Sequence, residues 1–409
     1  MPRIAASPLL QACLLGVTQI VGFGSTLYLL TVLAAPIGNA MGWPLAWVSG
    51  GMSAGIVTSA LVAPHVGRLI AREGGRRVLM TGSLLLAAGL ATIGLAWHYA
   101  IYLIGWSLVG LGMACSLYDA VFSTLGRAHG HKARRLISTV ALWGGFASTV
   151  FWTLSGVLVE AAGWRVTCLV YAAAQIAICL PLFFFAAPAG LAEAAPADPD
   201  RKARPHPVAR TVHTLEPART LSAILFIAEV LVASIIAVHL VNLLARMDVG
   251  LTAAVALGAF IGPAQVAGRA VEMTLGQRLH PAMTVILAIG AIITGLGLLT
   301  IDAPAVRMLA VIVYGAGIGV LSIARGTLPL ALFGPVRQPV VTGQIARPIM
   351  LVQAVSPVAG AFAITRLPPE TVLWLLAAIA GIALAAGLLL RRICLAQPDP
   401  AALPDSHST

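Results

Sequence analysis

Residues 67–77 read GRLIAREGGRR, and residues 268–278 read GRAVEMTLGQR with the same spacing of glycine and arginine. In each segment a Gly-Arg pair is separated by six residues from a second glycine, Gly75 in the first and Gly276 in the second. A proline stands shortly before each segment, and a Gly-x-Gly occurs in both halves, at 110–112 and 315–317. Matches at equivalent places indicate that the chain is built from two related halves.

The composition indicates whether the surface of this chain faces water or lipid. Charged residues make up 10% of the 409 residues, against about 25% in a soluble domain, while hydrophobic residues reach 59% and the mean hydropathy is +0.95. A soluble chain of this composition would lack the polar side chains needed to cover its cores. We therefore expect the lipid bilayer to be the main partner of the surface.

The apolar runs predict an all-α integral membrane protein with twelve transmembrane helices, each needing about 20 residues to cross. In the first half the helices are expected near 9–35, 45–66, 78–97, 101–122, 137–159 and 165–187. In the second half they are expected near 220–244, 251–271, 282–301, 305–325, 346–365 and 372–390. This pattern predicts two pseudo-symmetric six-helix bundles.

A polar segment rich in proline and charge, which includes PADPDRKARPHP, separates the two bundles. It cannot bury enough apolar area to fold by itself. The predicted organisation is an N-terminal bundle over 1–187, a cytoplasmic linker over 188–219, a C-terminal bundle over 220–391 and a cytoplasmic tail over 392–409.

The positive charges predict the orientation. With the N-terminus inside, only Arg165, Arg246, Arg307 and Arg366 of the 25 Lys and Arg fall on the outer side. This positive-inside bias places both termini in the cytoplasm and predicts a multi-pass protein of the cell inner (plasma) membrane. It also accounts for the net charge of +11, so that no nucleic-acid partner is needed to explain it.

The loop at 67–77 resembles the signature between the second and third helices of the major facilitator superfamily. The matching residues are Gly67, Leu69, Arg72, Gly74, Arg76 and Arg77. Ala71 stands where the signature has an aspartate, so the resemblance implies a gate without the usual acid contact to helix 11. Arg134-Arg135, Gly144-Gly145 and Gly163-Trp164-Arg165 are similar to the monocarboxylate-porter-like and related bacterial branches.

The branch stays open. Trp106 stands where drug–proton antiporters carry an arginine, and residues 263–265 read PAQ where monocarboxylate porters carry theirs. The resemblance implies alternating access, with helices 1, 4, 7 and 10 around a central cavity. The expected cavity residues are polar side chains of the first and tenth helices: Thr18, Gln19, Ser25, Arg307, Tyr314, Ser322 and Arg325.

Two acids are candidates for proton coupling. Glu229 is expected near the midplane of the seventh helix, where a carboxylate costs at least ~2.5–3.5 kcal/mol and normally faces a cavity or a partner. Its alternative role is a structural hydrogen bond. Asp119 is expected to end the fourth helix at a depth similar to that of Arg325, either as a solvated anchor or as one half of a gate pair.

These residues predict a proton-coupled secondary transporter of a small solute, with an organic anion favoured by Arg307 and Arg325. The alternative is an efflux pump for a drug, a metalloid or another toxic compound, in which Cys13 and Cys115 would serve a metalloid. No ATP-binding Gly-x-x-x-x-Gly-Lys-Ser/Thr and no His-Glu-x-x-His occurs, so we expect neither ATP hydrolysis nor an enzyme. We expect a monomer with no cofactor and no metal site, because the 129–131 His-Gly-His lacks a third ligand.

Overall fold

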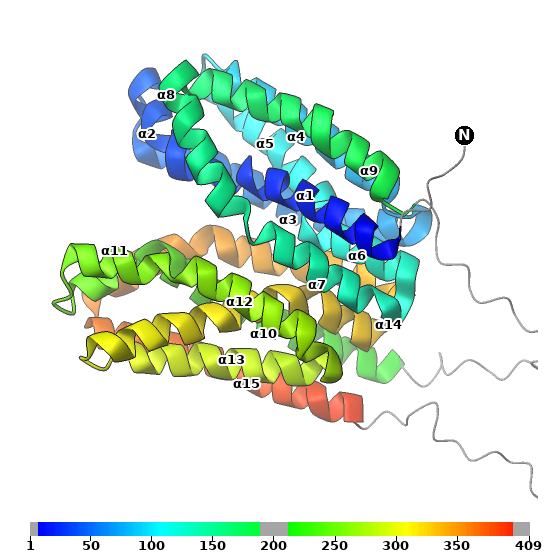
Figure 1. The fold of residues 1–409 in the computed structure, drawn as a ribbon, viewed down its shortest axis with the longest axis vertical. Coiled ribbons are helices and arrows are strands. Elements are labelled where there is room, and N and C mark those ends of the chain that lie inside the picture. Colours follow the sequence, from blue (N-terminus) through cyan, green and yellow to red (C-terminus); the bar gives the residue numbers. More distant parts are fainter. Residues whose placement is uncertain (1–6, 189–211, 396–409) are drawn as a thin grey trace, which may run out of the picture.

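The computed structural model describes residues 7–188 and 212–395, and all regular elements in these ranges are helices (Figure 1). The first half contains α1 (Pro8–Gly24), α2 (Leu29–Met41), α3 (Leu45–Glu73), α4 (Arg76–Gly94), α5 (Tyr99–Ser116), α6 (Tyr118–His129), α7 (Ala133–Gly144), α8 (Ala147–Ala174) and α9 (Leu180–Ala186). The second half contains α10 (Val212–Ala245), α11 (Leu251–Ala259), α12 (Ile261–Thr274), α13 (Pro281–Leu299), α14 (Pro304–Arg366) and α15 (Pro369–Leu395).

The described ranges contain ten apolar helical stretches that are long enough to cross a membrane. Two of them, 133–186 and 304–366, are more than twice the length that a crossing needs. Each contains one glycine in the left-handed region, Gly163 with φ 77° and Gly334 with φ 70°, where the helical geometry is interrupted. Because these two stretches cross twice and the others cross once, the fold has twelve transmembrane helices, as the apolar runs predict.

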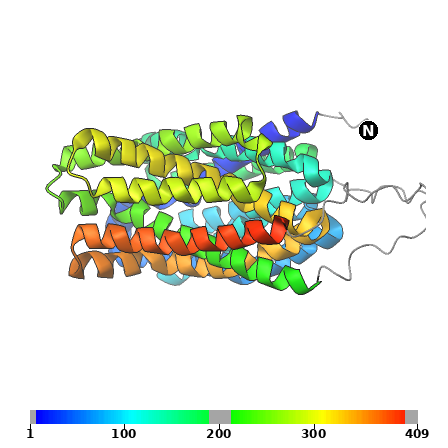
Figure 2. The same cartoon turned by 90° about the horizontal axis from the view of Figure 1, so that it is seen from below.

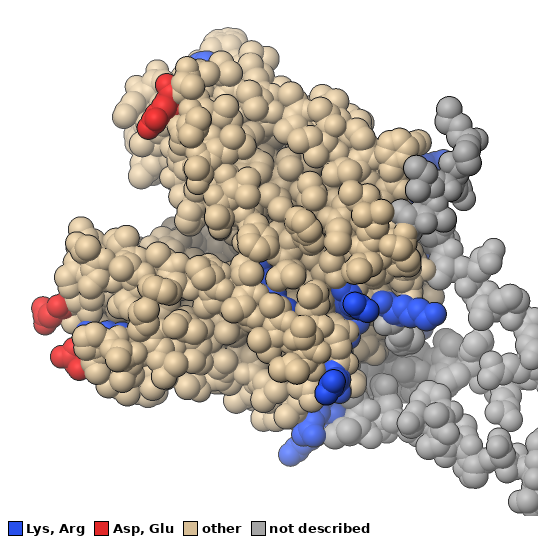
Figure 3. Space-filling model, viewed as in Figure 1, with Lys and Arg blue, Asp and Glu red and all other residues tan. Residues whose placement is uncertain are grey.

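The helices form two bundles, α1–α9 and α10–α15, each around an apolar core of its own (Figure 1). The starts of α1 and α10 and the ends of α9 and α15 gather at one end of the molecule, here named the linker end (Figure 1 and Figure 2). The bundles lie close together at the linker end and diverge toward the opposite, open end, where Figure 3 shows a hollow between them.

Glycines allow the two bundles to approach each other closely where α3 crosses α14. A Cβ atom added at Gly67 would lie 2.2 Å from the Pro339 carbonyl oxygen, and one added at Gly343 would lie 2.4 Å from that of Ala63. Both distances are far below any normal contact. The first glycine of the segment 67–77 is therefore a packing site between the halves.

Several boundaries differ from the sequence-based expectation; α3, for example, continues to Glu73 and includes most of the segment expected as a loop. Helix α10 begins at Val212, within the predicted linker, and α15 reaches Leu395, within the predicted tail. Asp119 does not end a helix: α5 ends at Ser116, the backbone is extended at Leu117 with ψ −171°, and α6 continues to His129. Residues 189–211 of the predicted linker and 396–409 of the predicted tail fall outside the described residues.

Candidate substrate cavity and gate

A cavity of about 210 Å³ lies between the two bundles. Both halves line it, with side chains from α1, α3, α5 and α6 on one side and from α10 and α14 on the other. Most of its lining is apolar. The charged residues among the described lining are Asp119, Glu229 and Arg325, and the neutral polar side chains are Ser59, Tyr118, Ser123, Ser322, Thr342 and Gln353.

Asp119 and Arg325 form an ion pair across the cavity. The Arg325 Nε donates to Asp119 Oδ1 at 3.0 Å, and its Nη2 donates to Oδ2 at 2.8 Å. This two-point geometry is the strong form of a carboxylate–guanidinium contact. The break at Leu117 places Asp119 in the first turn of α6, where the helix dipole also stabilises a negative charge. The pair joins the two halves, and its role as a gate stays a prediction.

Glu229 of α10 lines the same cavity but has no hydrogen bond and no ion pair with any described residue. Its side chain is half-buried. Arg325 and Tyr314, both of α14, interact with it electrostatically. The structure thus places the acid at the cavity, and none of the described residues forms the structural hydrogen bond that is its alternative role.

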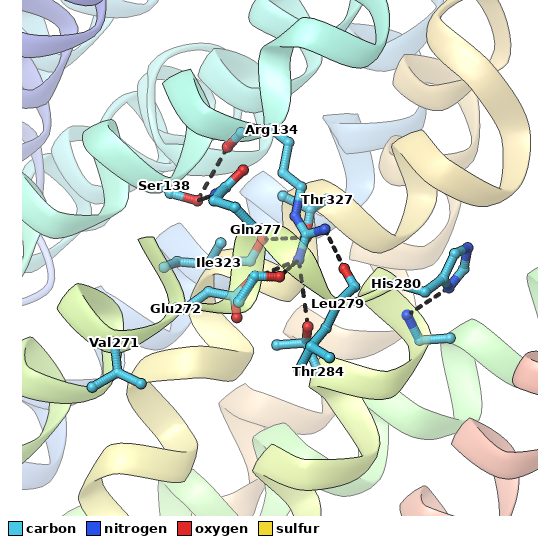
Figure 4. A network of polar contacts seen from close by, with 12 residues as sticks. Arg134, Ser138, Val271, Glu272, Gln277, Leu279, His280, Thr284, Ile323 and Thr327 are labelled. Carbon is cyan, nitrogen blue, oxygen red and sulfur yellow. Dashed lines mark hydrogen bonds and ion pairs between the residues drawn. The ribbon is translucent and has the colours of Figure 1, made fainter. Parts of the chain in front are cut away.

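A second polar cluster joins the bundles at the linker end, between α7 and α12 (Figure 4). The Arg134 Nη2 contacts Glu272 Oε1 at 2.9 Å and donates to the Gly276 carbonyl oxygen at 2.6 Å. Gln277 Nε2 donates to Ser138 Oγ at 3.2 Å beside it. Glu272 is 3% exposed, so the guanidinium supplies the charge that a buried carboxylate requires.

Sequence reasoning missed Glu272, although the repeat contained a signal for it. Glu272 is four residues after Gly268, just as Ala71 is four residues after Gly67. The acid of the repeated segment is thus present in the second half and absent from the first. Among the described residues, no acidic side chain of α3 forms an ion pair with α14. At position 71 the backbone carbonyl oxygen of Ala71 accepts a hydrogen bond from Arg127 Nε of α6 at 3.4 Å.

His280 caps α13 next to this cluster, and its Nδ1 accepts from the Ala282 N–H at 3.2 Å. Partial burial, and secondarily the positive charge of Arg134, lower the pKa of His280 below its usual value. Both influences favour the neutral ring that the cap requires.

The polar residues predicted on the first helix do not line the cavity. Thr18, Gln19 and Ser25 are buried within the N-terminal bundle. Gln19 Nε2 donates to the Ser116 carbonyl oxygen at 3.1 Å, and Ser25 Oγ accepts from Gln175 Nε2 at 3.0 Å. Their stripe holds α1 against α5 and the π-helical turn η2 (Gln175–Cys179), so the expectation that they face the substrate was wrong.

The residues predicted on the tenth helix separate into three environments. Arg307 lies at the open end, where it pairs with Asp302 at 2.9 Å, and does not line the cavity. Tyr314 lines a second cavity of about 220 Å³ inside the C-terminal bundle. Ser322 lines the central cavity together with Arg325, and its Oγ accepts from Arg269 Nε at 3.0 Å. Of the four polar residues on this face of α14, only Ser322 and Arg325 line the central cavity.

The residues of the segment 67–77 all lie at the linker end. Gly67 is the crossing point, Gly74 adopts φ 83°, and Leu69 packs against the first core. Arg76 Nε donates to the Ala187 carbonyl oxygen at 2.7 Å, which ties α4 to the end of the bundle. Arg72 and Arg77 are exposed.

Cys13 and Cys115 are free thiols that do not contribute to the lining of either cavity. No group of three or more His, Cys, Asp or Glu that could hold a metal ion occurs among the described residues.

A family model described as Major Facilitator Superfamily matches residues 14–349. The chain belongs to this superfamily. No curated protein sequence matches it.

Solved structures of superfamily transporters share the fold. FucP in the outward conformation superposes with a TM-score of 0.73 at 12% identity, over 94% of this chain and 99% of that chain. The E. coli fucose:proton symporter FucP gives 0.70 at 13% identity, over 94% and 98%. The human organic anion transporter MFSD10 (TETRAN) gives 0.69 at 16% identity, over 95% and 100%. At these identities the likeness shows the fold alone.

Proposed function

We propose that this superfamily member is a secondary active transporter that moves a small solute by alternating access and couples it to protons. The observation that carries the proposal is a cavity lined by both halves whose charged wall, Asp119 and Arg325, is an ion pair between the halves. A solute bound there touches both bundles, so its binding can bias how they are arranged.

The contacts at the linker end are those that must separate when this end opens. They are the Asp119–Arg325 pair, the Arg134–Glu272 pair and the glycine crossing of α3 with α14. Packed interfaces of this kind switch between discrete arrangements rather than deforming continuously. We infer that the structure represents the state that is closed at the linker end, and that a second state closes the open end.

The linker end is proposed to be cytoplasmic, with both termini inside and the protein in the cell inner membrane. Exposed cations at this end include Arg68, Arg72, Arg77, Lys132, Arg135, Arg278 and Arg337. In Figure 3 most of the visible Lys and Arg lie toward the linker end and the visible acids lie at the open end. The asymmetry supports a positive-inside orientation.

Glu229 is the better of the two candidates for proton coupling. In this state Asp119 is held by a two-point contact to Arg325, whereas Glu229 forms no ion pair with any described residue. A lone membrane-embedded carboxyl can cross between states only when it is neutralised by a proton or by substrate. A proton symporter among the superfamily members of similar fold supports this energy source.

The geometry gives no support to an organic anion as the solute. That expectation rested on two arginines in the cavity, but Arg307 lies outside it and Arg325 is already neutralised by Asp119. Efflux of a metalloid has no support either, because neither Cys13 nor Cys115 is among the residues that line the cavity.

Reconstitution of the full chain into liposomes tests the proposed function. A panel of labelled sugars, organic anions and organic cations is offered with an imposed pH gradient. We expect one class to accumulate above its equilibrium level and to leave again when a protonophore collapses the gradient. Solute movement that only equilibrates, with or without the pH gradient, would contradict proton-coupled transport.

A further inference from the structure

We propose that the central cavity binds an organic cation with an apolar body, for which Glu229 is the counter-charge. This substrate class depends on the transport function proposed above. Three features of the described residues support it: the charges in the cavity, the chemistry of its walls and the second cavity that adjoins it.

The charges in the cavity leave one carboxylate uncompensated. Three charged side chains line it, and two of them, Asp119 and Arg325, neutralise each other through two short hydrogen bonds. Glu229 is the third and forms no ion pair with a described residue. A bare carboxylate within the membrane is costly, so the site favours a ligand or a proton that supplies one positive charge. An organic anion would add a second uncompensated negative charge.

The walls suit an apolar body. Phe23, Leu27, Ile56, Met113 and Met350 line the cavity. The rings of Phe23 and Tyr118 lie with their centroids 4.5 Å apart, and both residues belong to the lining. Aromatic faces attract organic cations as well as apolar groups. Thioether side chains adapt to ligands of irregular shape.

The second cavity lies within the C-terminal bundle and shares Val230, Ile318 and Gln353 with the first. Its described lining contains no charged residue; the polar members are Ser234, Gln265, Tyr314 and Gln353. Val230 follows Glu229 directly in α10. A ligand whose cationic group meets Glu229 therefore has a neutral space beside it for the rest of its body.

Competition for one carboxylate determines the stoichiometry. The titratable groups that share the cavities with Glu229 are Tyr118 and Asp119 of α6 and Tyr314 and Arg325 of α14. Helix α15 also packs against α10 but has no charged residue between Glu370 and Arg391. Glu229 can thus hold either one proton or one monovalent cation, and the carrier exchanges them one for one. Because one positive charge moves each way, the exchange is electroneutral.

Two permanently charged probes test the inference, since neither gains or loses a proton itself. Phenyltrimethylammonium and benzenesulfonate are titrated into the full chain in lipid nanodiscs, in weakly buffered solution at several pH values. We expect phenyltrimethylammonium to bind with release of protons, and its affinity to rise by up to about tenfold per pH unit while Glu229 titrates. Benzenesulfonate should show no such binding.

Glu229→Gln should lower the ammonium affinity by about tenfold or more and remove its pH dependence. Glu229→Asp keeps the charge and should restore both. Glu160→Gln is the matched control, because Glu160 is exposed on α8 and lines neither cavity; it should behave as the wild type. Thermal unfolding of each variant shows that it is folded.

Benzenesulfonate binding as tightly as the ammonium, no ammonium binding at any pH, or a pH dependence that survives in Glu229→Gln would each overturn the inference. Proteoliposomes separate it from the proposed function. Ammonium binding without any solute movement refutes the transporter and leaves the cation site intact. Proton-driven transport of anions alone leaves the transporter intact and refutes the cation site.

Discussion

Arg325 of α14 donates two hydrogen bonds to the carboxylate of Asp119 in α6, and the two residues come from opposite halves of the chain. They lie 206 positions apart, close to the 201 that separate the equivalent glycines Gly67 and Gly268. The pair therefore joins nearly equivalent positions of the two repeats. Under the alternating access proposed above, this contact forms in one state of the carrier and breaks in the other.

Removing either charge of this pair should impair transport. In Asp119→Asn or Arg325→Gln one charge is left without its partner, which costs about 1–3 kcal/mol at such a partly exposed site. The rate of solute exchange in proteoliposomes should fall about tenfold or more. The swap Asp119→Arg with Arg325→Asp should recover part of the rate. A double variant no faster than the slower single variant would show that the pair does not act in transport.

The Arg134–Glu272 pair should hold the linker end closed. Glu272→Gln removes the charge but keeps the shape of the buried side chain, so we expect more molecules to be open at this end. The measurement is the distance between spin labels at Lys132 and Arg278, exposed residues on opposite sides of the contact. The wild type should show a short distance, and the variant an added longer one. Glu160→Gln serves as the control, and an identical distribution in Glu272→Gln would refute the role.

Gly67→Ala should act as a wedge between the bundles. Its Cβ atom would lie 2.2 Å from the Pro339 carbonyl oxygen, so α3 and α14 must separate. Overpacking of this kind costs ~1–3 kcal/mol, enough to favour a state open at the linker end. Gly156→Ala is the matched control, because nothing lies within 4 Å of its added Cβ. A cysteine at Ser123 should react faster with an impermeant thiol reagent from the linker end in Gly67→Ala, but not in Gly156→Ala.

The orientation can be tested with single cysteines in a chain whose own cysteines have been replaced. Lys132 is exposed at the linker end, and Ala162 is exposed beside the turn at Gly163 near the open end. In intact cells an impermeant thiol reagent should label a cysteine at 162 and spare one at 132. After the cells are broken both should react. Labelling of position 132 alone in intact cells would reverse the orientation.

The fold was predictable from sequence because membrane crossing requires long apolar runs that stand out locally. The contacts between helices were not. Thr18 and Arg307 were assigned to the cavity because they belong to polar stripes. Such a stripe shows that one face of a helix is more polar than the others, but not what that face contacts. The face at Thr18 meets the interior of its own bundle, and Arg307 sits at the open end beside Asp302.

Two further features depended on information that single helices do not carry. The break at Leu117 has no proline or glycine at its position, so it gave no local signal. The importance of Glu272 depends on Arg134, which is 138 positions away. Asp119, Glu229 and Arg325 could be selected from the sequence alone, because a charged residue in an apolar helix is costly and therefore rare.

We expect the Glu229 side chain to carry the coupled proton. Reorientation of the cavity requires that this carboxyl be neutral, either protonated or paired with a cationic solute. Glu229→Gln imitates the protonated form but can neither release nor take up a proton. Accumulation of solute driven by a pH gradient should therefore be lost in proteoliposomes. Exchange of labelled for unlabelled solute needs no net proton movement, so it should persist at saturating solute, with a weaker apparent affinity. Asp119→Asn should behave differently from Glu229→Gln. Because it loses the ion pair with Arg325, both its proton-driven accumulation and its solute exchange should become slower. If Glu229→Gln still accumulates solute to the wild-type level, the proton is carried elsewhere and Glu229 has no part in coupling.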